Sequence, residues 1–139
     1  MEKEKYLVFY ATIYVRIKGK NMKKIIKIHL KANGEGTLYC SELGTFKCLG
    51  KPGFPYKKDI TINTNSKQFI HRSAEFGGYE MYYSILIHGL RGVYIHAGSN
   101  NIIENEGPSA GCIHLKKSDA RKVYNWVDTS VRVLTTVSW

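Results

Sequence analysis

The chain has 139 residues, which is enough for one domain but not for two independent cores. Its 43% hydrophobic and 23% charged residues are typical of a globular protein, and its net charge of +10 indicates a polyanionic partner such as nucleic acid, an anionic membrane or an acidic wall polymer. Three cysteines are too few for a disulfide scaffold, and the longest apolar stretch, residues 6–15, is about half of what spans a bilayer. These properties exclude a disulfide-stapled miniprotein, a protein with a transmembrane segment and a multidomain enzyme.

The basic excess is concentrated at the N-terminus. Residues 1–31 contain nine lysines and arginines against two glutamates, a net charge of +7. A strand with lysines on its wet face and a nucleic-acid-binding stripe both account for this charge, but no recognisable nucleic-acid-binding module accompanies it. We therefore expect no stable nucleic-acid partner. We expect residues 1–21 to form a basic N-terminal strand or extension, with Met22 as an alternative start, and residues 22–139 to form the domain itself.

The first twenty residues loosely imitate a secretory signal but lack two of its features. The charged start contains two glutamates, and Arg16, Lys18 and Lys20 stand where a small-residue cleavage site belongs. Because residues 6–15 are rich in Tyr, Val, Ile and Thr, we interpret them as part of a strand and predict no Sec signal.

Most of the chain has the pattern of β-strands, with a single helix near the C-terminus. From Ser118 as the capping residue, Ala120, Val123, Tyr124 and Val127 fall on one helical face, and Asp119 suits the first turn. We predict a mainly β fold, whose strands cover residues 6–17, 23–31, 37–40, 45–49, 60–64, 81–88, 92–96 and 131–137.

A histidine and a cysteine flank a polar loop in the second half of the chain. His96 ends a predicted strand, and Cys112 follows a Ser-Ala-Gly turn after residues 97–110. A loop that folds back brings the imidazole to the thiol, which needs a nearby base or cation to become a nucleophilic thiolate. Gly111 lets its own N–H and that of Cys112 point at one developing oxyanion. A buried structural cysteine beside a core histidine is the alternative interpretation.

Several motifs in this region resemble the catalytic stretch of YkuD-type L,D-transpeptidases. The resemblance covers about residues 79–137 and rests on Gly-Val-Tyr-Ile-His96, on Ser-Ala-Gly-Cys112-Ile, on a Ser-Asp-Ala helix and on a Val-Arg-Val strand. It implies a YkuD-like β-sandwich or barrel of about eight to ten strands, with one helix following the catalytic cysteine. It also implies acyl transfer on peptidoglycan stem tetrapeptides through a thioester, without a cofactor, as an L,D-transpeptidase, an L,D-carboxypeptidase or a D-amino-acid exchange enzyme.

The resemblance assigns roles to individual residues. Cys112 is the nucleophile and His96 the general base, while the backbone carbonyl of Ala97 orients the imidazole and the N–H groups of Gly111 and Cys112 form the oxyanion hole. The expected substrate-binding residues are Tyr82, Tyr83, Arg91, Ser109 and His114.

Three departures from the family pattern accompany the match. Ala110 replaces the second histidine of the family's Ser/Thr-His-Gly-Cys motif, and His114 stands where an Asn or Arg follows the cysteine. The loop between His96 and Cys112 is also shorter than usual. We expect these departures to affect how the substrate is positioned and which acceptor is used. His114 either takes the place of the missing histidine or is a packed structural residue.

The remaining cysteines and histidines carry no assigned chemistry. Cys40 and Cys48 flank a turn around Gly44, and both a disulfide across a hairpin and two reduced, half-buried thiols are compatible with that spacing. His29, His71 and His88 lack the spacing of metal ligands, so we predict no metal site.

Two functions remain for testing from the sequence. The first is the cysteine acyltransferase, working in the cell envelope or periplasm on peptidoglycan stem peptides, with an immunity or inhibitor protein as a further partner. Without a Sec signal, non-Sec export (for example as a toxin delivered to competitors), a phage origin or cytoplasmic production stays open. The second is a catalytically inactive module of the same fold that binds wall or another polyanion.

Overall fold

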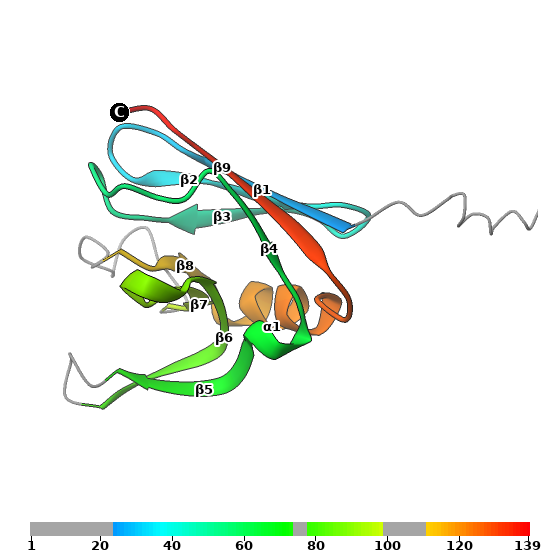
Figure 1. The fold of residues 1–139 in the computed structure, drawn as a ribbon. Coiled ribbons are helices and arrows are strands. Elements are labelled where there is room, and N and C mark those ends of the chain that lie inside the picture. Colours follow the sequence, from blue (N-terminus) through cyan, green and yellow to red (C-terminus); the bar gives the residue numbers. More distant parts are fainter. Residues whose placement is uncertain (1–23, 74–77, 99–110) are drawn as a thin grey trace, which may run out of the picture.

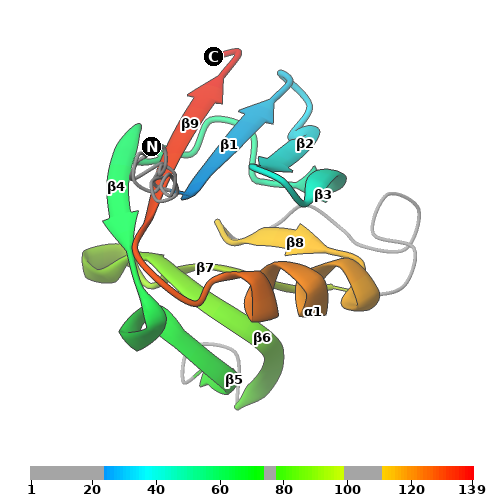
Figure 2. The same ribbon diagram turned by 90° about the vertical axis from the view of Figure 1, so that its right-hand side faces the viewer.

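The computed structural model describes residues 24–73, 78–98 and 111–139, which form one curled nine-stranded sheet and one α-helix. The strand order across the sheet is β4-β9-β1-β2-β3-β8-β7-β6-β5. Figures 1 and 2 show that the sheet folds into two halves, with the helix lying against the second half. The mainly β class, the number of strands and the late helix are as predicted from the sequence. The expected strand at residues 6–17 lies outside the described residues.

The first half of the sheet contains the antiparallel strands β1 (Lys24–Leu30), β2 (Glu35–Cys40) and β3 (Gly44–Leu49). On β1, Ile26, Ile28 and Leu30 are buried, whereas Lys27 and His29 are exposed, as expected for a half-buried strand. The C-terminal strand β9 (Val131–Val137) pairs in parallel with β1, and β4 (Asp59–Ile62) pairs with the other edge of β9.

The second half contains two strands that the sequence did not predict. It consists of β5 (Lys67–Ser73), β6 (Tyr79–His88), β7 (Val93–Ala97) and β8 (Ile113–Leu115). β5 was missed because it has several polar residues, and β8 because it has three residues only. The strand predicted at 60–64 ends at Ile62, and the 3-10 turn η1 (Thr64–Ser66) follows; η2 (Gly89–Arg91) connects β6 to β7.

Helix α1 (Lys117–Trp126) packs against β6, β7 and β8. Ala120, Val123 and Val127 are buried, as the helical pattern predicted. The predicted cap was wrong: Lys116 is the N-cap residue and makes no capping side-chain hydrogen bond, while Ser118 lies inside the first turn. Within the described ranges, no helix is long and apolar enough to cross a membrane.

Strand β6 is strongly curved (Figure 1), and Tyr83 lies in its middle with a φ of 54°. A bulky residue rarely adopts this left-handed conformation, so the surrounding packing must maintain it. The Tyr83 ring contacts Phe69 of β5 edge-on at 5.2 Å between centroids and Tyr124 of α1 at 5.6 Å. The left-handed residue thus lies within a ring cluster that joins β5, β6 and α1.

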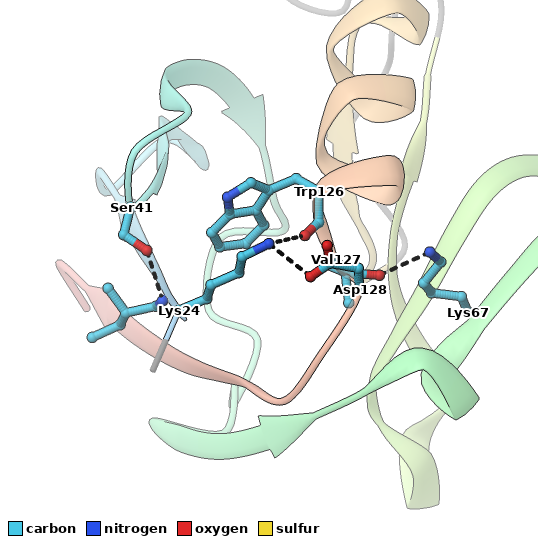
Figure 3. Close-up of polar contacts among 7 residues, drawn as sticks. Lys24, Ser41, Lys67, Trp126, Val127 and Asp128 are labelled. Carbon is cyan, nitrogen blue, oxygen red and sulfur yellow. Dashed lines mark hydrogen bonds and ion pairs between the residues drawn. The ribbon is translucent and has the colours of Figure 1, made fainter. Parts of the chain in front are cut away.

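Two lysines hold the C-terminal end of α1 (Figure 3). Lys24 of β1 donates to the carbonyl of Trp126 at 2.7 Å and to the carboxylate of Asp128 at 2.8 Å, with its ammonium 5.0 Å from the Trp126 ring centroid. Lys67 of β5 donates to the carbonyl of Val127 at 2.8 Å. Both cations meet the negative end of the helix dipole and satisfy carbonyls that have no partner within the helix. They link the helix to both halves of the sheet.

Replacing Lys24 with Met should lower the free energy of unfolding by about 1–2 kcal/mol, because a charge-assisted hydrogen bond at the helix C-terminus is lost while the apolar stem is kept. Urea denaturation followed by circular dichroism measures this difference. Lys27→Met is the matched control, since Lys27 is exposed on the same strand, and should change the free energy by less than about 0.5 kcal/mol. Equal effects of the two substitutions would contradict the anchoring role.

Candidate active site

Parallel pairing of β7 and β8 creates the centre of the candidate site. The register places Ile95 beside Ile113 and His96 beside His114. Cys112 immediately precedes β8, so it lies next to Tyr94, two residues before His96 on β7. Two short segments that are distant in sequence thus bring the predicted base and the predicted nucleophile to adjacent strands.

The sulfur of Cys112 lies against the backbone of β7, where it accepts a hydrogen bond from a backbone N–H group of that strand. The backbone N–H of Tyr94 donates to Sγ at 3.4 Å, and Sγ lies 3.9 Å from the carbonyl oxygen of Gly92. An N–H donor stabilises the thiolate, whereas a carbonyl accepts from the protonated thiol. The side chain is partly exposed, so a substrate can reach the sulfur.

His96 is held in one orientation. Its side chain is 2% exposed, and its Nδ1 lies 2.8 Å from the backbone oxygen of Ala97. A carbonyl oxygen only accepts, so this contact assigns the proton to Nδ1 and leaves the lone pair on Nε2. The His114 ring lies 4.5 Å from the His96 ring, centroid to centroid, with an interplanar angle of 59°. The structure therefore places two imidazoles together beside the thiol-bearing turn.

Gly111 adopts a φ of +137°, and a Cβ atom there would lie 2.9 Å from Cε1 of Phe54. Both the backbone conformation and the packed ring require glycine at this position. Phe54 thus packs directly against the peptide next to the nucleophile, where the oxyanion hole was expected.

Several aromatic residues around the thiol were not predicted from the sequence. The Tyr94 ring stacks on His71 of β5 at 4.3 Å between centroids, and the hydroxyl of Tyr56 accepts from the N–H of Lys51 at 2.7 Å. Burial raises the pKa of Tyr94, and a Cys112 thiolate raises it further. The pKa of Tyr56 is raised to about 12, mainly by burial. Tyr94 lies inside the Gly-Val-Tyr-Ile-His96 motif but was given no role there, and no local motif marks Tyr56 or His71, because long-range packing brings them to the site.

The expected substrate-binding residues lie in different parts of the structure. Arg91 lies on η2, with its guanidinium carbon 5.6 Å from the centroid of the Phe54 ring. Tyr82 and Tyr83 contact β5 and α1: Tyr82 donates to Glu80 at 2.8 Å and lies 6.1 Å from the Phe69 centroid. Ser109 and Ala110 lie outside the described residues.

Cys40 and Cys48 do not form a disulfide. The hairpin register pairs Cys40 with Gly44 and Cys48 with Gly36, so the two cysteines are not cross-strand partners, and both are buried and free. Burial raises the pKa of each thiol to about 12. Among the described residues, no group of three or more His, Cys, Asp or Glu side chains is arranged to hold a metal ion.

Iodoacetamide should modify Cys112 of the folded protein at least about 100-fold faster than Cys40 or Cys48 at pH 7.5, because those two thiols are buried with pKa values raised to about 12, whereas Cys112 is partly exposed. Intact-mass spectrometry should show a single adduct, which peptide mapping assigns. Cys112→Ala protein is the control and should remain unmodified over the same period. Comparable modification of all three thiols in the folded state would refute this description of the site.

Solved structures share the fold. An L,D-transpeptidase from Stackebrandtia nassauensis matches with a TM-score of 0.66 and 22% sequence identity, over 84% of this chain and 56% of that one. An L,D-transpeptidase from Mycobacterium smegmatis matches with a TM-score of 0.56 and 19% identity, over 84% and 61% of the two chains. L,D-transpeptidase 1 from Mycobacterium tuberculosis gives 0.57 and 18%, over 83% and 62%. The chain thus spans less than two thirds of the length of these proteins.

A search of curated proteins found no match to the chain. The family model of the L,D-transpeptidase catalytic domain, YkuD, matches residues 12–134, which extends well beyond the segment on which the sequence resemblance rested. The chain therefore belongs to the YkuD family of L,D-transpeptidase catalytic domains.

Proposed function

We propose that this domain performs acyl transfer on peptidoglycan stem tetrapeptides, with Cys112 as the nucleophile. The observation that carries the proposal is the seating of the Cys112 sulfur beside β7, where the Tyr94 N–H donates to it and the oriented His96 follows on the same strand. Family membership supports peptidoglycan as the substrate and the cell envelope as the place of action.

In the first half of the reaction, Nε2 of His96 accepts the thiol proton while Cys112 Sγ attacks the carbonyl carbon that precedes the terminal D-alanine. The hydrogen bond from Nδ1 to Ala97 keeps the lone pair of Nε2 available for this transfer. The N–H groups of Gly111 and Cys112 stabilise the tetrahedral oxyanion. The protonated His96 then gives its proton to the departing amine, and a thioester remains.

In the second half, a nucleophile attacks the thioester and releases Cys112. An amine of another stem gives a cross-link, a free D-amino acid gives exchange, and water gives carboxypeptidase action. His96 removes the proton of the incoming nucleophile and returns it to the thiolate. Tyr82, Tyr83, Ser109 and His114 are proposed as residues that line the path of the stem peptide.

Incubation of a purified disaccharide-tetrapeptide with the protein, followed by mass spectrometry, tests this function. Loss of D-alanine indicates carboxypeptidase action, a covalent dimer indicates transpeptidation, and incorporation of an added D-amino acid indicates exchange. Cys112→Ala protein should give none of these products. If wild-type protein leaves the muropeptide unchanged at several pH values, the catalytic proposal is wrong, and the inactive binding module becomes the better description.

Gly111→Ala should reduce kcat/KM by about 100-fold or more, because the added methyl group displaces the peptide that supplies the oxyanion N–H groups. Gly44→Ala is a closely matched control: Gly44 has a φ of +131°, but its added Cβ would meet nothing within 4 Å. Both variants should lose stability through backbone strain, and Gly111→Ala should lose more because its Cβ also meets the Phe54 ring, but only Gly111→Ala should lose activity while it remains folded. Loss of activity in both would attribute the effect to folding instead.

A further inference from the structure

Arg91 lies on η2, next to the candidate active site, and His88 is the residue just before η2. Arg91 and Lys57 are exposed, and within the described part of the chain neither forms an ion pair. His88 ends β6, and its Nδ1 is buried without a hydrogen-bond partner. An exposed cation that forms no ion pair generates a positive potential that attracts an anion.

Arg91 lies close to the residues that surround the nucleophile. Its guanidinium lies 5.6 Å from the centroid of the Phe54 ring, and the edge of that ring packs against Gly111, next to the nucleophile. The following residue, Gly92, has its carbonyl oxygen 3.9 Å from Cys112 Sγ. Arg91 is therefore connected to the surroundings of the thiol in two ways: through the Phe54 ring, which packs against Gly111, and through Gly92, whose carbonyl oxygen lies near Sγ.

The positive charge near η2 affects the pKa of His88. Burial lowers the pKa of His88, and the positive charges of Lys57 and Arg91 lower it further. An anion bound at Arg91 would offset part of this positive charge and raise that pKa. His88 therefore serves as a reporter of occupancy.

The dimensions suit one particular anion. In a peptide whose leaving residue is C-terminal, three bonds connect the attacked carbonyl carbon to the terminal carboxylate carbon, a path of about 4 Å. A group bound that close to the reacting carbon must meet residues that adjoin the nucleophile. Arginine matches a carboxylate with two parallel N–H donors, and stacking on an aromatic ring restricts its orientation before binding.

We propose that Arg91 forms a subsite for the terminal carboxylate of the leaving residue, an inference that rests on the proposed acyl transfer. Arg91 binds the carboxylate directly. The subsite makes the enzyme select donor stems that end immediately after the scissile bond. It discriminates against donors in which that carboxylate is amidated or extended by another residue.

Binding to Cys112→Ala protein tests the subsite without turnover. The probes are a stem tetrapeptide with a free C-terminal D-alanine carboxylate and the same peptide as its C-terminal amide. We expect the acid to bind about tenfold more tightly or better, and Arg91→Gln to abolish this preference. NMR of the His88 ring should show a raised pKa with the acid and not with the amide. Arg121→Gln, which alters an exposed arginine on α1, and Lys58→Gln, next to Lys57, should retain the preference.

Equal binding of acid and amide, or an undiminished preference in Arg91→Gln, would overturn the subsite. Failure of the proposed function has a different signature. If wild-type protein gives no product but the Cys112→Ala protein still distinguishes acid from amide, the subsite stands and catalysis on this substrate is wrong. If wild-type protein turns over both donors with equal kcat/KM, the acyl transfer stands and the subsite is wrong.

Discussion

The short parallel pairing between β7 and β8 is the constraint on which the candidate site depends. β8 has three residues, and its link to β3 is the single pair Leu49 and His114, so backbone hydrogen bonds alone hold it weakly. Ile113 and Leu115 are fully buried, and α1 packs over β6, β7 and β8. Apolar burial beneath the helix thus fixes a strand too short to be stable by itself, and Cys112 is positioned by that strand.

The same helix connects the site to the rest of the sheet. Lys24 and Lys67 approach its C-terminal end from opposite halves of the sheet, and Tyr124 on its surface supports the bent Tyr83 of β6. Curvature of β6, in turn, accompanies the stacking of His71 from β5 on Tyr94, whose N–H donates to the thiol. Segments from early and late in the described chain therefore contribute to the surroundings of the nucleophile.

Sequence patterns predicted those features that depend on local periodicity. Alternation identified β1 and β9, helical spacing identified α1, and a family resemblance singled out His96 and Cys112. Features set by distant contacts were missed: polar β5, three-residue β8, and Phe54 against Gly111. The capping prediction at Ser118 failed because a cap depends on where the chain turns, which the preceding strand decides here. For Cys40 and Cys48, the hairpin register decided between the two open alternatives.

The two contacts of the thiol and the pair of imidazoles together describe how a proton can move here. Sγ has an acceptor for its proton, Gly92 O, and a donor for its thiolate, Tyr94 N–H, so both states are accommodated without rearrangement. Two unit charges 4.5 Å apart repel by about 4 kcal/mol at an effective dielectric constant of 20, so His96 and His114 disfavour being charged together. In the proposed reaction, where His96 accepts the thiol proton, this repulsion makes the second imidazole part of the electrostatic surroundings of the base.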